Sequence, residues 1–453
     1  MNDTFKILSP TAILGYGYPI QSLLNGFKKN PDLVAVDAGS TDPGPYYLGS
    51  GKPFTNRAGV KRDLFNIIKY CIPKKIPLII GTAGGSGAKP HVDWSVDIVK
   101  EICKELSLSV QLGVIYSDIP KEVVKKSIAS KELKPLNFAP DISAKEVDNI
   151  TNVVAQMGIE PIQEAIKKEC DIILCGRCYD PAVFAALPIM YGYDDGLAVH
   201  LGKILECAAI AATPGSGADC VLGTLTKDSF ILEPLSKERK FTSESTAAHT
   251  LYEKSNPYFL PGPGGRLNLT ECTFKELSNG RVEVKGSKFE LSDDYFIKLE
   301  GAKVTGYRTI SIAGTRDPIM IDQIDAIIKK VSKLISNYQK EQNIQGKVLF
   351  HVYGKDGVMG NLEPNITITS HELGIIIDVV ADTEEDSETL CSITRSTLLH
   401  YGYKGRISTA GNLAFPFSPS DVHMGEVYEF SLYHLMKIKD QDLFAFKKIR
   451  IKN

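Results

Sequence analysis

In the first half of the chain, short apolar runs alternate with longer amphipathic segments. Residues 57–72 and 92–106 have a helical repeat; in the second, Val92, Val96 and Val99 recur at three- and four-residue steps. The apolar runs, which we expect to form buried strands, are FKILSPTAIL, LVAV, PLIIGTAG, VQLGVIY and CDIILCG. This alternation predicts a wound, largely parallel β-sheet with helices on both faces and with ligands beyond the carboxyl ends of its strands.

The pattern changes between about residues 221 and 314, where β-like runs are separated by turns such as Asn279-Gly280. We expect these runs to extend the first sheet in antiparallel fashion. Residues 318–342 follow as a long amphipathic helix, and residues 345–453 alternate strands with one helix, as in a small α+β unit. The chain is therefore predicted to form an N-terminal α/β domain over 1–342 and a C-terminal α+β domain over 343–453.

The composition is that of an ordinary globular protein. The chain has 453 residues, 43% hydrophobic and 23% charged, with a net charge of −2. This length predicts two domains, and the near balance of charges argues against nucleic acid as a partner. We find neither a secretory signal nor an apolar run long enough to span a membrane. The nine cysteines are scattered, mostly in apolar runs, which predicts buried thiols and a cytoplasmic protein.

The stretch DAGSTDPGPYYLGSG (37–51) follows the predicted strand LVAV. It is so rich in Gly, Pro and Ser that we expect neither helix nor strand there. Asp37 and Asp42 are candidate acid–base groups. Ser40, Thr41 and Tyr46 are candidate substrate contacts, and the whole loop is predicted to form one wall of a pocket.

A second loop, GTAGGSGAKPHVDW (81–94), follows PLII. Its small residues are able to turn backbone N–H groups toward a carboxylate or phosphate, and the start of the next helix adds a positive dipole. Its candidate anion-binding residues are Gly84, Gly85, Ser86 and Gly87. The alternative is a tight turn with a helix cap, in which His91 and Asp93 stand at the start of the helix.

The third loop, CGRCYDP (175–181), follows CDIIL. Cys175 and Cys178 form a CxxC pair, which is compatible with a redox pair, with half of a metal site or with plain loop thiols. No second CxxC supplies the other two ligands of a zinc site. Arg177 is the candidate for holding a substrate carboxylate, and Asp180 is a further candidate contact at a helix start.

The segment 196–212 is predicted to be one buried, nearly apolar helix. His200, Lys203 and Glu206 interrupt it at three-residue steps. Buried titratable groups are costly unless they are paired. These side chains are therefore either a structural network or an acid–base set, and His200 and Glu206 are candidate catalytic residues.

In the stretch 243–269, His249 and Glu253 lie four residues apart on a predicted helix. They are candidate catalytic residues, as a base with its orienting carboxylate; two metal ligands or an exposed ion pair are the alternatives. The turn PGPGGR then places Arg266 at its tip as a candidate substrate contact. These five small-residue segments are expected to meet at one rim of the sheet.

Six stretches of the chain together resemble the acyclic terpene utilization family typified by AtuA. They occur in family order over nearly the whole chain: DAGSTDPGPYYLG, GTAGGSG, CGRCYDP, HLGKILECAA, STAAHTLYE and AGNLAFPFSPSD. The resemblance implies a large N-terminal α/β domain, a C-terminal ferredoxin-like domain and, in some relatives, a small separate second protein. It also implies a role in the breakdown of small, often branched carboxylic acids or their CoA esters, without assigning a catalytic residue.

We therefore expect a catabolic enzyme, a hydratase, lyase or isomerase that moves a proton beside a carbonyl. One alternative is a substrate-binding or regulatory subunit of a heteromeric enzyme; another is an acyl transferase with Cys178 or Cys207 as nucleophile. No nicotinamide, flavin or pyridoxal fingerprint is evident, and Mg²⁺ is a candidate ion for Asp37, Asp42 or Glu253. A homo-oligomer is expected, with a small second subunit as a candidate partner.

Overall fold

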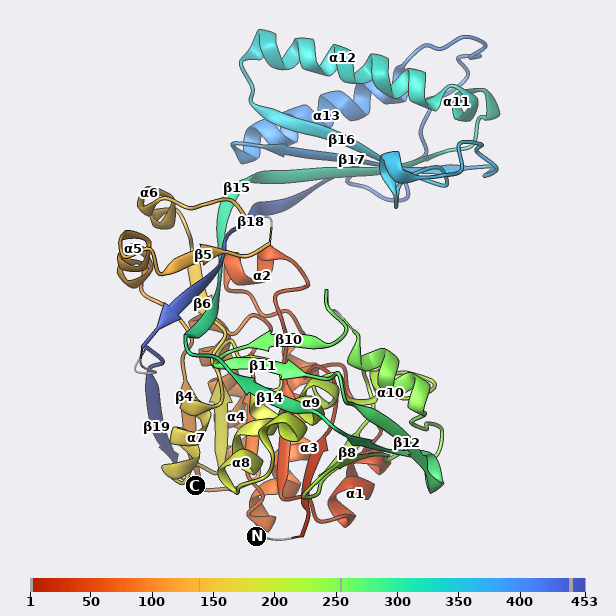
Figure 1. The fold of residues 1–453 in the computed structure, drawn as a ribbon. Coiled ribbons are helices and arrows are strands. Elements are labelled where there is room, and N and C mark those ends of the chain that lie inside the picture. Colours follow the sequence, from red (N-terminus) through yellow and green to blue (C-terminus); the bar gives the residue numbers. More distant parts are fainter. Residues whose placement is uncertain (1–2, 138, 253–254, 440–442, 453) are drawn as a thin grey trace. The chain divides into compact units, whose positions relative to one another are not determined.

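The computed structural model describes residues 3–137, 139–252, 255–439 and 443–452 (Figure 1). Its internal contacts divide the chain into two compact units. Unit 1 comprises residues 1–303 and 430–453, and unit 2 comprises residues 304–429. Strands β15 (Tyr295–Thr315) and β18 (Asp421–Ile438) each contribute residues to both units.

The core of unit 1 is one long sheet with the strand order β12-β13-β9-β8-β1-β2-β3-β7-β4-β19. Its five central strands are parallel: β1 (Phe5–Ser9), β2 (Leu33–Asp37), β3 (Leu78–Gly81), β7 (Ile172–Cys175) and β4 (Val110–Ile115). Antiparallel strands extend both edges: β8 (Val221–Leu225), β9 (Phe230–Pro234), β13 (Arg281–Lys285), β12 (Thr273–Leu277) and β19 (Phe446–Ile451). The predicted wound sheet and its antiparallel extension are confirmed.

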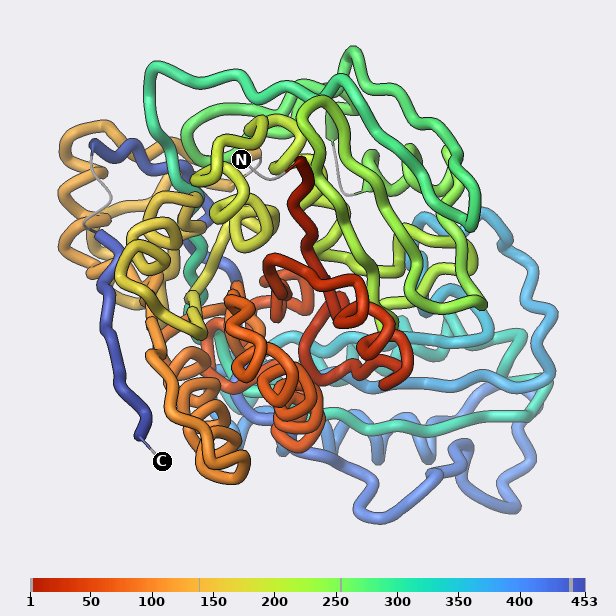
Figure 2. Tube along the Cα trace, turned by 90° about the horizontal axis from the view of Figure 1, so that it is seen from below, coloured from red at the N-terminus to blue at the C-terminus, as the bar shows by residue number. Residues whose placement is uncertain are grey.

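Successive residues of the central strands enter two separate hydrophobic cores. On β1, Ile7 packs in one core and Leu8 in the other, as the two-residue period of a strand requires. One core is closed by α7 (Glu160–Lys167), α8 (Ala182–Met190) and α9 (Asp195–Leu205), the other by α1 (Ile20–Lys28), α3 (Arg57–Cys71) and α4 (Lys89–Glu105). Figure 2 shows α3 and α4 in orange and α8 in yellow on opposite sides of the red N-terminal strand. The predicted covering of both faces by helices is thus confirmed.

Two local predictions were wrong. Residues 45–50 form a short helix, α2 (Pro45–Ser50), within the stretch expected to be irregular. Proline at its first position has the φ that a helix needs, and Gly51 ends it at a φ of +69°, so both residues act at the helix termini. The helix expected over 196–212 ends at Leu205, because Ala208 has a φ of +47° that an α-helix excludes.

The remaining elements of unit 1 lie outside the long sheet. They include a three-stranded antiparallel sheet of β10 (Phe259–Gly262), β11 (Gly265–Asn268) and β14 (Lys288–Leu291). The others are α5 (Lys121–Ala129), β5 (Leu133–Pro135), α6 (Ala144–Asp148), β6 (Asn152–Ala155), α10 (Ser243–Thr250) and the 3₁₀ turns η1 (Ile72–Lys74), η2 (Ala208–Ala211) and η3 (Ser278–Gly280).

Unit 2 packs helices against a sheet. Its strands β16 (Gly346–Tyr353) and β17 (Leu373–Ala381) pair antiparallel, and β17 also pairs with β15. Helices α12 (Ile324–Gln342) and α13 (Glu384–His400) share a core with this sheet (Figure 1), and α11 (Pro318–Asp322) and η4 (Gly360–Leu362) complete the unit.

The element order of unit 2 is β15-α12-β16-β17-α13-β18, an order described for ferredoxin-like units. The ferredoxin-like assignment itself stays a prediction, and so does the domain boundary at residue 342. Helix α12, which the sequence assigned to the first domain, buries Ile327 and Val331 in the core of unit 2.

Two absences agree with the sequence. Among the described residues, every helix is too short or too polar to cross a membrane. The nine cysteines all lie in the described part of the chain and form no disulfide.

Candidate functional site

Three turns follow neighbouring strands of the central sheet and lie against one another. Asp37 is the last residue of β2, the loop 82–88 follows β3, and the segment 176–181 follows β7. A Cβ atom on Gly39 would collide with the backbone of the loop 82–88, and one on Gly87 would collide with the backbone of the segment 176–181. These glycines therefore permit the close approach of the three turns.

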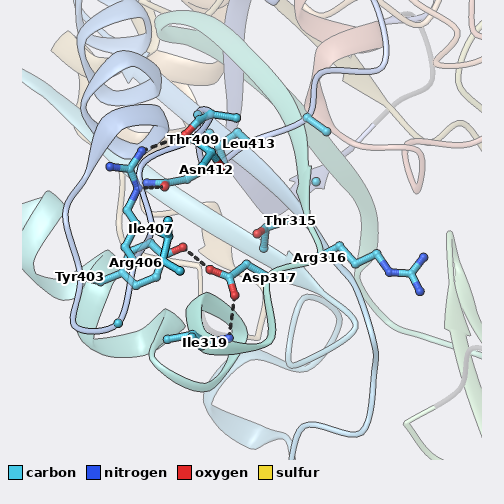
Figure 3. Close-up of a pocket in the computed structure, with 15 residues that line it drawn as sticks. Thr315, Arg316, Asp317, Ile319, Tyr403, Arg406, Ile407, Thr409, Asn412 and Leu413 are labelled. Atoms are coloured by element: carbon cyan, nitrogen blue, oxygen red, sulfur yellow. Dashed lines mark hydrogen bonds between the residues drawn. The ribbon is translucent and has the colours of Figure 1, made fainter.

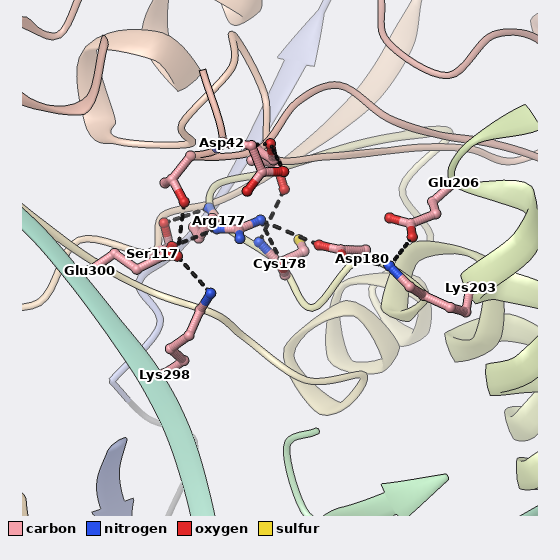
Figure 4. Close-up of polar contacts among 12 residues, drawn as sticks. Asp42, Ser117, Arg177, Cys178, Asp180, Lys203, Glu206, Lys298 and Glu300 are labelled. Carbon is pink, nitrogen blue, oxygen red and sulfur yellow. Dashed lines mark hydrogen bonds and ion pairs between the residues drawn. The ribbon is translucent and has the colours of Figure 1, made fainter. Parts of the chain in front are cut away.

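A buried ion pair joins the third turn to β15. The Arg177 Nε donates to the Glu300 Oε2 at 2.7 Å, and the Lys298 Nζ lies 2.7 Å from the Glu300 Oε1 (Figure 4). The Thr41 hydroxyl donates to the same oxygen at 2.9 Å. Burial opposes the ionisation of Glu300, but the two cations outweigh it and lower its pKa to about 2. Glu300 is therefore a buried, ionised carboxylate at neutral pH.

A second set of charges lies beside the first. The Lys203 Nζ contacts the Glu206 carboxylate and lies 3.4 Å from the Asp180 Oδ2 (Figure 4). The other Asp180 oxygen lies 3.4 Å from the Arg177 Nη1, so Asp180 bridges the two sets. Burial opposes ionisation of Asp180, yet Lys203 and Arg177 lower its pKa below the ordinary value. The pKa of Glu206 is raised, first by burial and then by the negative charge of Asp180.

Asp37 completes the cluster and is its least satisfied member. It is 5% exposed, and its Oδ1 has no hydrogen-bond partner among the described residues. Burial, followed by repulsion from Asp180, raises its pKa well above the ordinary value. Oxygen atoms of Asp37, Asp180 and Glu206 lie within 4.8 Å of one another, a spacing that is able to hold a divalent cation.

Charges in this cluster do not balance when every group is ionised. The cluster contains four carboxylates and three cationic side chains. We call these seven residues the charged cluster: Asp37, Asp180, Glu206, Glu300, Arg177, Lys203 and Lys298. A buried excess of negative charge is costly. It is removed by one proton on Asp37 or Glu206, in agreement with their raised pKa values, or by a bound cation.

The chain was compared with protein families, curated proteins and solved structures. One family model matches, described as "Acyclic terpene utilisation family protein AtuA", over residues 57–220. The resemblance to the AtuA family is confirmed over these residues. No curated protein and no solved structure matches the chain. We call residues 57–220 the AtuA segment; it contains Arg177, Asp180, Lys203 and Glu206 of the charged cluster.

Within the AtuA segment, the glycine-rich loop is held by backbone hydrogen bonds to the segment 175–176 and within itself. The N–H groups of Thr82 and Ala83 donate to carbonyls of the segment 175–176, and the N–H group of Gly85 donates back to Thr82. The Gly85 N–H is thus already bonded within the protein, which leaves fewer of the predicted anion-binding N–H groups, such as those of Gly84 and Gly87, for a ligand. The anion cradle stays a prediction. The buried Ser86 hydroxyl, which has no partner in the described structure, is the group best placed to contact a ligand.

The helix-cap interpretation of the same loop is observed for His91. Its Nδ1 accepts a hydrogen bond from the Ala88 N–H at 3.2 Å, and its Nε2 lies 2.9 Å from the Lys52 carbonyl oxygen. Burial lowers its pKa. Asp93 binds the Tyr116 hydroxyl at 2.7 Å. These residues hold the start of α4 in place.

His200 was expected to act together with Lys203 and Glu206, but its observed partners lie elsewhere. It is fully buried, with its Nδ1 2.7 Å from the Ser287 Oγ and its Nε2 3.1 Å from the Thr250 Oγ1. Only the i, i+3 pair of Lys203 and Glu206 forms the predicted contact.

Other candidates lie in their own local contacts. Ser40 donates to the exposed Asp42 at 2.7 Å, and the Tyr46 hydroxyl accepts from Lys52 at 3.1 Å. His249 stacks on a tyrosine, with ring centroids 5.2 Å apart. Glu253 lies outside the described residues, so its predicted pairing with His249 is not described.

Arg266 and the CxxC pair complete the set of candidates. The Arg266 Nε donates to the exposed Glu290 at 2.6 Å. Cys175 and Cys178 are both buried, and the Cys178 thiol donates to the Gly176 carbonyl at 3.3 Å. In the part of the chain that the structure describes, neither cysteine belongs to a cluster of three metal-ligating side chains, so a CxxC metal site gains no support.

Two members of the charged cluster, Lys298 and Glu300, were missed by sequence reasoning. A signal was present in FIKLEGA (296–302), where a lysine and a glutamate interrupt an apolar strand two residues apart. Alternation places both on one face of β15. Nothing in the sequence alone indicated that this face meets Arg177.

A separate cavity of about 460 Å³ lies within unit 2, lined by residues 314–319 and 403–414 (Figure 3). Its polar side chains largely satisfy one another. Tyr403 donates to Asp317, and the Arg406 Nε donates to the Asn412 Oδ1 at 2.6 Å. Arg316 is exposed and points away from these pairs in Figure 3. The cavity is therefore a weaker candidate site than the charged cluster.

Proposed function

We propose that the protein is a catabolic enzyme that moves a proton beside the carbonyl of a small carboxylate or its CoA thioester, as a hydratase, lyase or isomerase. The AtuA family description names acyclic terpene utilisation, which is a catabolic role. The observation that carries the chemical part of the proposal is Asp37, a buried carboxyl with an unpartnered oxygen beside two further carboxylates.

Dehydration beside a carbonyl needs a base for the C–H proton and an acid for the departing hydroxyl. The cluster holds neighbouring carboxyl groups whose pKa values are driven in opposite directions. This is the arrangement by which one active site keeps one carboxyl ionised and another protonated at the same pH. Asp180, ionised and partly exposed, is proposed as the base, and Asp37 as the acid.

In the proposed step, Asp180 takes the proton from the carbon next to the carbonyl. The electron pair of that C–H bond forms the new C=C bond while the C–O bond breaks. The proton of Asp37 goes to the departing hydroxyl, which leaves as water. Lys203 and Arg177 keep Asp180 ionised through their contacts with it, and hydration is the reverse of these steps.

A metal ion is the alternative to the proton on Asp37, because a carboxylate that ligates a metal is deprotonated. Its ligands would be Asp37, Asp180 and Glu206 rather than Asp42, since the first three carboxylates are the ones that lie close together. A divalent cation there would stabilise the enolate charge that develops on the substrate.

The test is deuterium exchange. Purified protein is incubated in D₂O with unsaturated dicarboxylates and with enoyl thioesters, and exchange or hydration is followed by NMR. We expect exchange by the native protein, a loss of at least about a hundredfold in Asp37→Asn, as is typical for removal of an acid–base group, and normal exchange in the exposed control Asp97→Asn. Equal exchange by the two variants would refute the role of Asp37.

A second candidate, a substrate-binding or regulatory subunit, is favoured by exposed apolar side chains in unit 2. Val358, Leu362 and Ile366 are 86%, 79% and 93% exposed on one loop. Exposed apolar groups of this kind are typical of interaction surfaces. A chain that is inert alone but gains exchange activity with a co-purifying small protein would support this function.

A further inference from the structure

A cavity of unit 1 lies beside the three-stranded sheet β10-β11-β14. Its volume is about 700 Å³, within the range of small-molecule sites. Its walls come from that sheet, from the first residues of β15 and from the last part of β18. Leu136 and Asn137, which follow β5, also line it. The lining residues that the argument uses are Pro261, Arg266, Leu291, Phe296, Lys298 and Tyr433.

One face of β15 connects this cavity with the charged cluster. Phe296, Lys298 and Glu300 are alternate residues of β15. Their side chains therefore point to the same face of the strand, at intervals of about 7 Å. Phe296 and Lys298 line the cavity, and Glu300 is the buried partner of Arg177. Lys298 is therefore the residue of the charged cluster that also lines the cavity, with the apolar Phe296 on one side of it along β15 and Glu300 on the other.

Lys298 is the shared residue. Its ammonium group lies 2.7 Å from the Glu300 Oε1 and 5.0 Å from the centroid of the Tyr433 ring. The side chain is 20% exposed, and an ammonium group has three N–H donors. One donor faces Glu300, so the group has further donors for an anion that enters the cavity.

The rest of the cavity is suited to an apolar body. Leu291 lines it and is 83% exposed, so its side chain is open to contact with a ligand. Phe296 and Pro261 add apolar surface. The acidic side chains on the walls are already paired: Glu290 with Arg266 at 2.6 Å, and Asp294 with Lys437 at 2.5 Å.

A buried hydroxyl stands directly behind the cavity wall. A Cβ atom on Gly262, which lines the cavity, would lie 2.7 Å from the Tyr179 ring. The Tyr179 hydroxyl is buried, and no hydrogen-bond partner for it is found in the described residues. Tyr179 is the residue before Asp180, the proposed base.

We infer that this cavity binds a medium-chain carboxylate, or the corresponding thioester, with its apolar body against Leu291 and Phe296 and its carboxyl or carbonyl end at Lys298. Only the further assignment of this ligand as the substrate rests on the proposed function.

The test is calorimetric binding to the full chain. The probe is octanoate; octanamide, which has the same body without the charge, and butyrate, which has the charge with a shorter body, are the comparison ligands. We expect octanoate to bind at least about tenfold more tightly than octanamide, since one charge-assisted hydrogen bond is worth about that much. It should exceed butyrate by at least the same factor, because its longer body buries more methylene groups, each worth about 0.8 kcal/mol when fully buried. Lys298→Met should remove the preference for octanoate over octanamide.

Two further variants separate binding from folding. Lys285→Met makes the same change at an exposed lysine outside the cavity and should bind octanoate normally. Leu291→Asp changes a side chain that is already exposed, so the fold is expected to persist while octanoate affinity falls at least about tenfold through charge repulsion and lost apolar contact.

The inference is overturned if octanoate does not bind, or if Lys298→Met and Leu291→Asp bind it as the native protein does. Failure of the proposed function is a different result: octanoate binds through Lys298, but the protein catalyses no exchange in D₂O. Exchange of short dicarboxylates without octanoate binding would overturn the cavity assignment alone.

Discussion

Glu300→Gln tests the centre of the charged cluster, because it removes one negative charge and almost no volume. Glu300 is fully buried and pairs with Arg177 and Lys298. Its pKa falls from an ordinary 4.5 to about 2, and each pKa unit corresponds to about 1.4 kcal/mol, so its ionised form stabilises the fold by about 3 kcal/mol. At neutral pH the variant should lose this amount or more, because breaking a buried pair typically costs 3–5 kcal/mol.

The sign of the pH dependence follows from the lowered pKa. The contribution of Glu300 is complete above pH 4.5 and is lost as the pH falls toward about 2, where the native protein protonates the group. The difference in unfolding free energy between the native protein and Glu300→Gln should therefore be constant near neutrality. It should shrink below pH 4.5, by at most about 1.4 kcal/mol per pH unit.

The assay uses the single tryptophan of the chain, Trp94, which packs partly buried against a core of unit 1. Its fluorescence during urea titration reports the unfolding of unit 1. Glu101→Gln is the matched control, since it removes a carboxylate from an exposed pair with Arg57 and Lys61, which should matter far less. An equal, small loss of unfolding free energy in Glu300→Gln and Glu101→Gln would refute the reasoning. So would a difference between the native protein and Glu300→Gln that does not change with pH.

Three further predictions concern the charged cluster and the neighbouring CxxC turn. Burial and a neighbouring carboxylate raise the Asp37 pKa, so the contribution of Asp37 to the free energy of unfolding falls as the pH rises from 3.8, by up to about 1.4 kcal/mol per pH unit. In the Trp94 assay, Asp37→Asn should therefore gain stability relative to the native protein over this range, while Asp97→Asn should not. Lys203→Met leaves Asp180 and Glu206 without their ammonium partner, so the variant should lose about 3–5 kcal/mol of unfolding free energy. It should also lose deuterium exchange; normal exchange would show that the role of Lys203 is purely structural. Cys178 is fully buried, so mass spectrometry should find it unlabelled after iodoacetamide treatment of the native protein. Cys178→Ser should keep exchange activity. Both results would argue against the acyl transferase alternative.

The sheet was predictable because its strands carry apolar side chains on both faces. In LVAV, alternate residues fill alternate cores, and such a run between amphipathic helices has few other stable arrangements. The ends of elements were harder to predict. Pro45 and Gly51 read as loop residues, although each has a role at a helix terminus, and Ala208 gave no sign of its positive φ.

The candidate site was predictable only where strands end. Asp37, Arg177 and Asp180 follow parallel neighbours, so sheet topology brings them together. Lys298 and Glu300 come from β15, which pairs with β6 rather than with the central strands, and no local pattern encodes that pairing. For His200 the local pattern was misleading. The three-residue spacing predicted that it would act with Lys203 and Glu206, but its ring nitrogens contact the hydroxyls of Ser287 and Thr250 instead.

The unpartnered groups are the strongest argument for a functional cluster over a structural one. A structural network of buried charges is stable when each member is paired, as Glu300 is by two cations and a hydroxyl. Asp37 Oδ1, Ser86 Oγ and Tyr179 Oη are buried without hydrogen-bond partners in the described structure, and they follow β2, β3 and β7 in the same part of unit 1. Each costs free energy that folding alone does not require, and such exceptions gather where a protein binds or transforms a ligand.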